Sequence, residues 1–333
     1  MHIATQAVTT RTMALAMGAM PFLVMAQPHE STYPNREVSI VIGYPPGGGV
    51  DVLARVLAKH LSKELEQKVV IIYKPGAAGN IGAEAVARRA KPDGYTLFMS
   101  ARPNTIHKVM YANLKFDFAQ DLRPIGLIGT SPNIIVTGEH TLINDLDDLL
   151  YIAAEYPGRL RCASSGIGTT GYLLCEMFQQ ETGTKIEHVP YKGSEQGYID
   201  LVGGRVDVLF TTLPAAAPHI AAGAVRGVAL MSQQIDGHSV KVPTLGQLGY
   251  PMLDLDSWAG LMAPAGTPDY AIDKLNSALN TLLESEEMRA DMARLDYFPA
   301  QPPNRPLTFH TLIAQETERW TAILKTRGIF SFH

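Results

Sequence analysis

The sequence predicts an α/β protein with two lobes, each a sheet flanked by helices, and a ligand cleft between the lobes. Short apolar, β-branched runs alternate with glycine-rich loops and amphipathic stretches in the first third of the chain, which indicates β-loop-α units and a parallel sheet. The same order of units recurs in the second third, and further helical stretches remain to return to the first lobe. These observations favour a clamshell whose lobes are joined by two crossovers.

The first unit surrounds residues 44–51, Tyr-Pro-Pro-Gly-Gly-Gly-Val-Asp. The apolar run 38–42 predicts a buried strand before this loop, and apolar residues at three- and four-residue steps over 53–65 predict a helix after it. The loop therefore places several backbone N–H groups beside the positive end of a helix dipole, which suits an anion. The candidate binding residues here are Tyr44, Pro46, Gly47, Gly48, Gly49 and Asp51.

Spacing argues against a nucleotide site in this loop. A P-loop requires Lys-Ser/Thr after the glycines, whereas Val50 and Asp51 follow here, and a dinucleotide fingerprint requires spaced glycines. A tight strand-to-helix turn without a ligand remains an alternative. In that case Asp51 only accepts hydrogen bonds from free N–H groups in the first helical turn.

A second glycine-rich loop, residues 73–82, follows a predicted strand at 69–72 and leads into a predicted helix over 83–90. The next predicted strand, 96–99, ends at the segment 100–102. Loops that leave the carboxyl ends of neighbouring parallel strands meet over one crevice, so we expect both glycine loops and this segment to face the same cleft. The candidates are Ala78, Gly79, Asn80, Ile81 and Ala101.

Hydroxyl-bearing loops replace the glycine loops in the second lobe. Its strands are predicted at 134–136, 160–163, 186–189 and 206–210, and a helix over 146–155 has Asn144 and Asp145 as candidate caps. Ser and Thr hydroxyls can bind a small polar ligand, although Thr169 and Thr170 are equally suited to cap the next helix. The candidates are Ser164, Gly166, Thr169, Thr170, Tyr191, Gly193, Ser194 and Thr211.

The last part of the chain contains a strand-like run at 258–262 and helical patterns at 269–283 and 307–326. We expect these elements to complete the first lobe. The predicted division assigns residues 33–132 and 256–333 to lobe 1 and residues 133–255 to lobe 2, with hinges near 130–134 and 253–257.

The N-terminus resembles a cleaved secretory signal peptide over residues 1–26. Arg11 precedes an apolar run at 13–26 that contains no charge and ends at the small residue Ala26. No later segment is long and apolar enough to span a bilayer, so we expect a soluble, exported protein. The net charge of −4 and the absence of a basic cluster argue against nucleic acid as a partner.

The sequence contains no recognisable catalytic or metal-binding motif, so we expect no metal, no cofactor and no enzymatic activity. His107, His188 and His219 lack ligand spacing. Cys162 and Cys175 fall in a predicted strand and helix, which favours two buried free thiols over a disulfide. Three cations lie in or beside the cleft loops, where each could pair with a carboxylate or remain solvated: Lys74, Arg102 and Lys192.

Several motifs resemble, in order, those of the Bug-type substrate-binding proteins of tripartite tricarboxylate transporters. The resemblance covers about residues 33 to 325. Its motifs are Tyr-Pro-Asn-Arg (33–36), Pro-Pro-Gly-Gly-Gly-Val-Asp (45–51), Ala-Arg (54–55), Pro-Gly-Ala-Ala-Gly-Asn-Ile-Gly (75–82), Pro-Asp-Gly-Tyr-Thr-Leu (92–97), His-Val-Pro-Tyr-Lys-Gly (188–193), Pro-Thr (243–244) and Pro-Ala-Gly-Thr-Pro (264–268).

The resemblance implies a periplasmic, two-lobed, type II periplasmic-binding-protein-like fold with one carboxylate-bearing ligand held between the lobes. In that family the first-lobe loops engage a carboxylate, partly through ordered waters, and the second lobe contacts the rest of the ligand. The usual partner is a membrane permease of one large and one small subunit, and a monomer is the usual state. The sensing of a ligand on behalf of a membrane sensor kinase is an alternative function, and an exported enzyme is a third.

Three departures from the family pattern place Tyr73, Tyr172 and Tyr198 where the family usually carries other residues. Tyr73-Lys74 replaces Asn-Arg, Tyr172 replaces a common His, and bulkier residues follow Ser194. The hypothesis is that these tyrosines shape a pocket for an aromatic or bulkier carboxylate.

Overall fold

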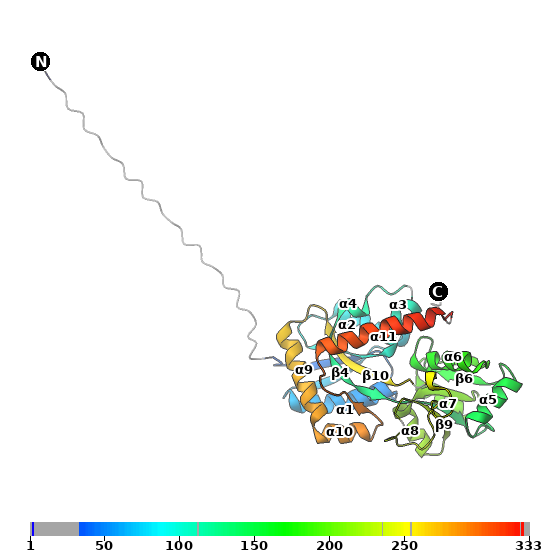
Figure 1. Cartoon of the computed structure of the whole chain (residues 1–333). Coiled ribbons are helices and arrows are strands. Elements are labelled where there is room, and N and C mark those ends of the chain that lie inside the picture. Colours follow the sequence, from blue (N-terminus) through cyan, green and yellow to red (C-terminus); the bar gives the residue numbers. More distant parts are fainter. Residues whose placement is uncertain are drawn as a thin grey trace. The chain divides into compact units, whose positions relative to one another are not determined.

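The computed structural model describes residues 33–111, 113–234, 236–253, 255–326 and 328–329, together with His2. Residues 33 to 333 form one compact unit, whose helices and strands are labelled in Figure 1. The predicted signal peptide lies outside the described residues apart from His2. Within the described part of the chain, no helix is long and apolar enough to cross a membrane.

The first sheet has six strands in the order β11-β4-β10-β3-β1-β2. Their bounds are Val38–Ile42 (β1), Val69–Tyr73 (β2), Thr96–Ala101 (β3), Leu122–Ser131 (β4), Ser257–Pro264 (β10) and Phe298–Pro299 (β11). β1 lies between β2 and β3 and is parallel to both, as expected for successive β-loop-α units. β10 lies between β3 and β4 and is antiparallel to both.

The second sheet has five strands in the order β7-β6-β8-β5-β9. Their bounds are Asn133–Gly138 (β5), Arg161–Ser164 (β6), Glu187–Pro190 (β7), Val208–Thr212 (β8) and Val225–Met231 (β9). β6 is parallel to both β7 and β8. β5 lies between β8 and β9 and is antiparallel to both.

The two sheets therefore share one plan, in which the antiparallel strand is the one that arrives from the other lobe. β4 ends at Ser131 and β5 begins two residues later, while β10 follows the second crossing of the chain. The two crossings are tied together, since the Asn133 side chain donates to the Leu255 carbonyl and accepts from Ser257 Oγ at 2.8 Å. The prediction of two lobes, each a sheet with helices, is confirmed.

Helices cover both faces of each sheet. Their bounds are Gly49–Glu64 (α1), Asn80–Arg89 (α2), His107–Met110 (α3), Phe118–Asp121 (α4), Leu146–Glu155 (α5), Thr170–Thr182 (α6), Ser194–Val202 (α7), Leu213–Ala221 (α8), Asp269–Glu284 (α9), Glu286–Ala293 (α10) and Pro306–Thr326 (α11), with 3-10 turns at Ala77–Gly79 (η2), Arg102–Ile106 (η3) and Pro251–Leu253 (η4). Apolar clusters join α1, α9 and α10 to one face of the first sheet and α2, α4 and α11 to the other. In the second sheet, α5 and α6 pack on one face and α7 and α8 on the other.

Every strand and helix expected from the sequence is present, but β4, β9, β11, α3, α4, α8 and α10 were not predicted. β4 contains Pro124, Gly126 and Gly129, residues that weaken a strand pattern. The structure explains the glycines by packing, because a Cβ at Gly129 would lie 2.4 Å from the Phe298 carbonyl oxygen on β11. Tertiary contact, rather than local propensity, forms this strand.

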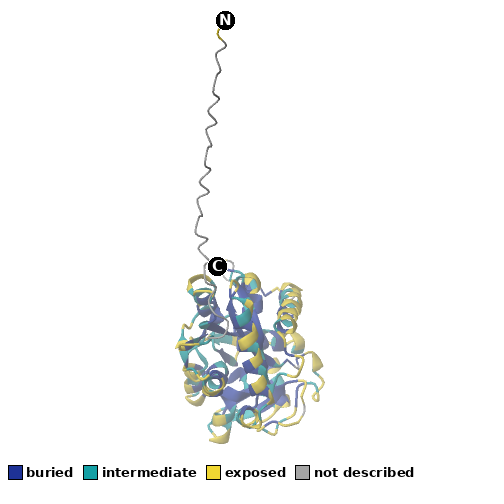
Figure 2. Ribbon diagram, turned by 90° about the vertical axis from the view of Figure 1, so that its left-hand side faces the viewer, coloured by how far each residue is buried: buried dark blue, intermediate teal, exposed yellow. Residues whose placement is uncertain are grey.

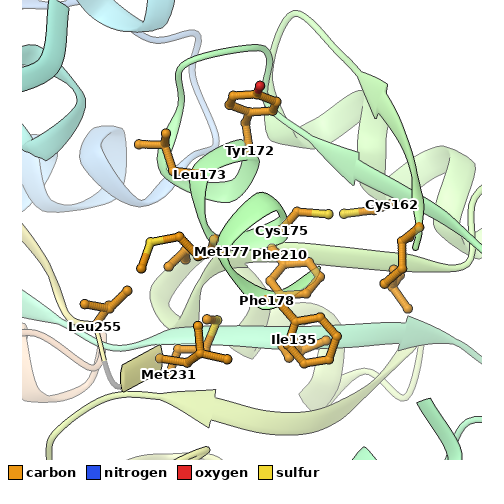
Figure 3. Close-up of a cluster of buried hydrophobic side chains, with 14 of the residues drawn as sticks. Ile135, Cys162, Tyr172, Leu173, Cys175, Met177, Phe178, Phe210, Met231 and Leu255 are labelled. Atoms are coloured by element: carbon orange, nitrogen blue, oxygen red, sulfur yellow. The ribbon is translucent and has the colours of Figure 1, made fainter. Parts of the chain in front are cut away.

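One apolar cluster includes residues of both lobes. Trp320 and Leu324 of α11 pack with Tyr172, Leu173 and Met177, which belong to α6 in the second lobe. Buried residues concentrate along the strands and exposed ones on the outer helices (Figure 2), and Figure 3 shows the second-lobe side of this cluster. The C-terminal helix therefore connects the first lobe to the core of the second.

Candidate functional site

A cleft lies where the two lobes face each other, with a volume of about 90 Å³. The expected residues that line it come from both lobes: Tyr44, Gly48, Gly49, Ala101, Thr169, Thr170, Gly193, Ser194 and Thr211. The other expected residues lie beside or behind the lining: Pro46, Gly47, Asp51, Ala78, Gly79, Asn80, Ile81, Ser164, Gly166 and Tyr191.

Four helices begin at this cleft. Their N-cap residues are Gly48 (α1), Thr169 (α6), Gly193 (α7) and Thr212 (α8), all of which line the cleft. None of these residues caps its helix with a side-chain hydrogen bond. The first N–H groups of a helix have no partner within the helix, and its dipole is positive at that end. The cleft therefore gathers backbone donors and partial positive charge at one place.

Free hydroxyl groups add to these donors. Among the described residues, no hydrogen bond involves the side chains of Ser165, Thr170, Ser194 or Thr212, and all four residues line the cleft. The Thr169 hydroxyl donates to the Gly166 carbonyl at 2.6 Å instead of capping α6, so it shapes the loop. The second lobe thus supplies side-chain oxygens, while the first-lobe loop supplies backbone.

Asp51 closes the first glycine loop and does not face the cleft. Its carboxylate accepts from the Gly47 N–H at 2.9 Å and from the Tyr73 hydroxyl at 2.7 Å, and Arg55 Nε lies 3.1 Å from it. The Asp51 residue is 2% exposed. This geometry matches the interpretation of Asp51 as an acceptor for free N–H groups, with Tyr73 as its support.

The second glycine loop lies behind Tyr44. The Tyr44 hydroxyl donates to the Ala78 carbonyl at 2.9 Å, and Asn80 is fully buried with its amide donating to the Ala77 carbonyl at 2.7 Å. Ala77 and Ala78 have φ values of 47° and 50°, which are strained for residues with a Cβ. The second glycine loop therefore supports Tyr44, and Tyr44 lines the cleft.

The lobes touch across the cleft, and glycine permits the contact. A Cβ at Gly49 would lie 2.6 Å from Thr212 Oγ1, and one at Gly193 would lie 2.6 Å from Pro45 Cγ. The Tyr111 hydroxyl of the first lobe also donates to the Ile167 carbonyl of the second at 2.7 Å. The structure is a closed arrangement in which the two halves of the cleft are in contact.

Arg102 is the one charged residue in the described lining. Its Nε donates to Glu316 Oε2 at 2.8 Å, and the same oxygen accepts from the indole nitrogens of Trp258 and Trp320, each at 3.2 Å. Arg102 Nη1 is buried without a partner among the described residues. Burial lowers the pKa of Arg102, and Glu316 opposes this shift. Lys74 and Lys192 are exposed outside the lining, so of the three candidate cations only Arg102 borders the cleft.

Ser164 and His188 form a hydrogen-bonded pair behind the cleft, with Ser164 Oγ 2.7 Å from His188 Nε2. Ser164 has no exposed surface, and among the described residues no carboxylate hydrogen-bonds to His188 to orient its imidazole. Burial lowers the pKa of His188 from its ordinary 6.5 to about 4. The pair therefore supports the β6–α6 loop with a neutral imidazole.

The walls of the cleft are aromatic, but not through the expected tyrosines. Tyr172 and Tyr198 are buried outside the lining, and Tyr198 stacks on His219 at 4.0 Å between ring centroids. With Tyr73 holding Asp51, none of the three expected tyrosines lines the cleft. The aromatic residues that do line it are Tyr44, Phe210, Trp258 and Tyr297.

Several lining residues were missed because they come from β10 and the segments near it. β10 runs antiparallel to β3, so its first residues lie beside the last residues of β3, with Ala259 opposite Ala101. The rule that ligands meet the carboxyl ends of parallel strands does not point to the start of an antiparallel strand. The missed lining residues are Pro45, Val50, Ser131, Ser165, Gly171, Phe210, Thr212, Ala215, Ser257, Trp258, Ala259 and Tyr297.

The described residues contain no group of three or more His, Cys, Asp or Glu side chains that could hold a metal ion. The site is therefore described by backbone donors, hydroxyls, aromatic walls and one guanidinium group. This arrangement can hold a small anion with an apolar body, and it shows no nucleophile that is both exposed and activated among those residues.

Comparison with known proteins identifies relatives of this chain. The chain is 35% identical over 300 residues to the protein BugT of Bordetella pertussis, covering 89% of this chain and 91% of BugT. It superimposes on R. palustris Rpa4515 with adipate at 31% identity and a TM-score of 0.86, covering 90% of this chain and all of that one. It also superimposes on the periplasmic binding protein BugD at 28% identity and a TM-score of 0.85, with coverage of 90% and 100%.

A third solved structure, MatC from Rhodopseudomonas palustris with bound malate, is 26% identical with a TM-score of 0.81, covering 88% of this chain and all of MatC. The family model described as the tripartite tricarboxylate transporter family receptor matches residues 53–329. This match includes every strand of the two sheets except β1, and it includes the C-terminal helix. The chain belongs to the receptor family of the tripartite tricarboxylate transporters, the family of solute-binding proteins that includes the Bug proteins.

Proposed function

We propose that this protein is an exported, periplasmic receptor that closes around one small carboxylate-bearing ligand and delivers it to a membrane permease of one large and one small subunit. The observation that carries the ligand class is the convergence of four uncapped helix N-termini on one cleft. A carboxylate satisfies such donors and is favoured by the helix dipoles.

The charge of the lining supports an anionic ligand. The described lining contains the guanidinium group of Arg102 and no carboxylate. Because Nη1 of Arg102 has no partner among the described residues, the group retains positive charge that Glu316 does not fully satisfy. We propose that Arg102 attracts the ligand carboxylate through this charge, with the hydroxyls of the second lobe completing its hydrogen bonds.

The size of the cleft and the residues of its walls restrict the class of ligand further. A cleft of about 90 Å³ favours a small ligand. Adipate and malate, found in the structures of Rpa4515 and MatC, are small dicarboxylic acids. The aromatic walls suit a ligand with a flat or apolar body beyond its carboxylate.

Closure and opening follow from the two crossings of the chain. We propose hinges at 130–134 and 253–257, between a first lobe of residues 33–132 and 256–333 and a second lobe of residues 133–255. The bond between Asn133 and Ser257 then holds the hinge strands together while the lobes move. We also propose that the protein is a monomer and that it binds its ligand without chemical turnover.

Native mass spectrometry of the protein expressed from the full chain, followed by thermal-shift titration, tests the proposal. The acids are mono-, di- and tricarboxylates and aromatic acids, each paired with its neutral amide. A ligand at 100 times its dissociation constant stabilises the folded state by about 2.7 kcal/mol, so a true ligand raises the melting temperature while its amide does not. If no acid shifts the folded protein, or if the amides shift it equally, the carboxylate proposal is wrong.

A further inference from the structure

The two cysteines of the protein lie against each other behind the cleft loop of the second lobe. Cys162 is on β6 and Cys175 is on α6, and neither has any exposed surface. Their sulfur atoms point toward each other in Figure 3, and both residues belong to one buried cluster. Both are free in this structure, in agreement with the expectation of two buried thiols.

The surroundings of these thiols do not indicate catalysis or metal binding. Cys162 Sγ lies 3.5 Å from the Ala163 carbonyl oxygen, and Gln179 Nε2 donates to Cys175 Sγ at 3.7 Å. Neither residue lines the cleft. Burial raises the pKa of the Cys175 thiol, so in the folded protein it is a poor nucleophile and a poor metal ligand. A catalytic or metal-binding function is therefore disfavoured for this pair.

We propose that Cys162 and Cys175 form a disulfide in the exported protein, joining β6 to α6 at the base of the loop that carries Ser165 and Thr170. This inference rests on the proposed export, because disulfides persist in oxidising compartments and are rare in the cytosol. Bond formation requires the two sulfur atoms to approach to about 2.05 Å. The strand and helix already present the two side chains to each other.

The oxidation is a two-electron exchange with the disulfide of a thiol–disulfide oxidant. The thiolate of one cysteine attacks the oxidant disulfide and forms a mixed disulfide, and the second cysteine then displaces the oxidant thiol. One S–S bond forms in the protein, one breaks in the oxidant, and two electrons and two protons pass to the oxidant as its two thiols. Since both cysteines are fully buried in the fold, the exchange precedes the docking of α6 on β6.

The disulfide would join the two ends of the loop between β6 and α6, and this loop lines the cleft. Residues 163–174 between the two cysteines include Ser165 and Thr170, which line the cleft, and Ile167, whose carbonyl accepts from Tyr111 of the first lobe. A cross-link at the base of this segment limits the conformations of the unfolded chain and fixes the ends of the loop. We expect the oxidised protein to melt about 5–10 °C above the reduced protein.

A thiol count on protein from the periplasmic fraction tests the bond directly. The fraction is quenched in acid and alkylated with iodoacetamide in denaturant, with and without prior reduction, and the intact mass is measured. We expect no alkylation without reductant and two alkylations after reduction. Two alkylations without reductant in folded, periplasmic protein would overturn the proposal.

Single variants supply the matched controls. In C162A and in C175A the remaining cysteine should be alkylated without reductant, which excludes protection by another modification. In the double variant the melting temperature should not change on addition of reductant, whereas that of the parent protein should fall. Equal melting temperatures of the parent protein with and without reductant would remove the stabilising role.

The experiment separates this inference from the function proposed above. If the full chain stays in the cytoplasm, the export has failed, and the thiol count after the purified protein is unfolded and refolded in oxidised glutathione decides whether the two cysteines join. If the protein is exported with a disulfide but binds no acid, the ligand proposal fails and the disulfide stands.

Discussion

The helices of this protein begin in two ways. α4, α5 and α10 begin away from the cleft, and their N-caps Asp117, Asp145 and Ser285 accept hydrogen bonds from backbone N–H groups. α1, α6, α7 and α8 begin at the cleft, and none of them has a side-chain cap. α2, α3 and α9 also lack a side-chain cap, although their N-cap residues do not line the cleft. Among the described N-caps, side-chain caps therefore occur only away from the cleft, and the helices at the cleft leave their first N–H groups available to a ligand.

The largest effect should come from removing the positive charge beside these uncapped helices. Arg102→Met leaves the Glu316 carboxylate buried with two indole donors and, as its remaining cation, Arg319, whose Nη1 lies 3.9 Å from Oε1. We therefore expect a loss of about 3 kcal/mol in unfolding free energy. Urea denaturation measures this loss. Adding Glu316→Gln should restore most of the stability while ligand binding stays weak. Normal affinity in the double variant would show that Arg102 serves α11 and not the ligand.

Acid should weaken the second-lobe half of the cleft through His188. Its pKa is lowered to about 4 in the folded protein from an ordinary 6.5, so folding favours the neutral imidazole. This contribution is fully present above pH 6.5 and is lost as the pH falls toward 4, by about 2–3 kcal/mol in total. Melting curves between pH 7 and pH 4 should fall more steeply for the parent protein than for His188→Asn. Parallel curves would contradict the assignment.

A single methyl group placed between the lobes should separate closure from folding. Gly49→Ala puts a Cβ 2.6 Å from Thr212 Oγ1 of the other lobe, so closure is hindered while α1 still forms. We expect the affinity for the ligand to fall roughly tenfold to a hundredfold, or about 1.4–2.7 kcal/mol, with little change in melting temperature. Isothermal titration measures the affinity.

Gly48 supplies the matched control for this substitution. A Cβ there would lie 3.5 Å from Ser194 Oγ, which is an ordinary contact, and the backbone is extended with a φ of −78°. Gly48→Ala should therefore bind nearly as the parent protein does. Equal losses in both variants would mean that the glycine loop is sensitive to any side chain and that closure is not the cause.

The sequence could predict the elements that depend on local patterns, and it could not predict those that depend on tertiary pairing. The β-loop-α units and helices such as 146–155 follow from periodicity and capping, and the glycine and hydroxyl loops were placed at the cleft because parallel strands end together. Trp258 and Tyr297 were not predicted as lining residues. They reach the cleft from an antiparallel strand and from a loop late in the chain, and only tertiary pairing brings these two segments to the cleft. Tyr172 was expected in the pocket, but its side chain is buried against the His188 ring and does not line the cleft.

The smallest effects test the capping contrast itself. Asp145→Ala removes a side chain that accepts from the Asp148 N–H at 3.0 Å, so we expect a loss of about 1 kcal/mol in unfolding free energy and unchanged ligand affinity. Thr212→Ala removes an N-cap hydroxyl that makes no hydrogen bond to its helix, so it should cost less stability and instead weaken binding severalfold. Chemical denaturation and titration of both variants give the two quantities for each position. The contrast holds only if Asp145→Ala lowers the stability and keeps the ligand affinity, while Thr212→Ala lowers the ligand affinity more than the stability. A variant at Thr212 that loses stability and keeps its affinity would show that α8 uses this hydroxyl as an ordinary cap, and the cleft would then contain one donor fewer for its ligand.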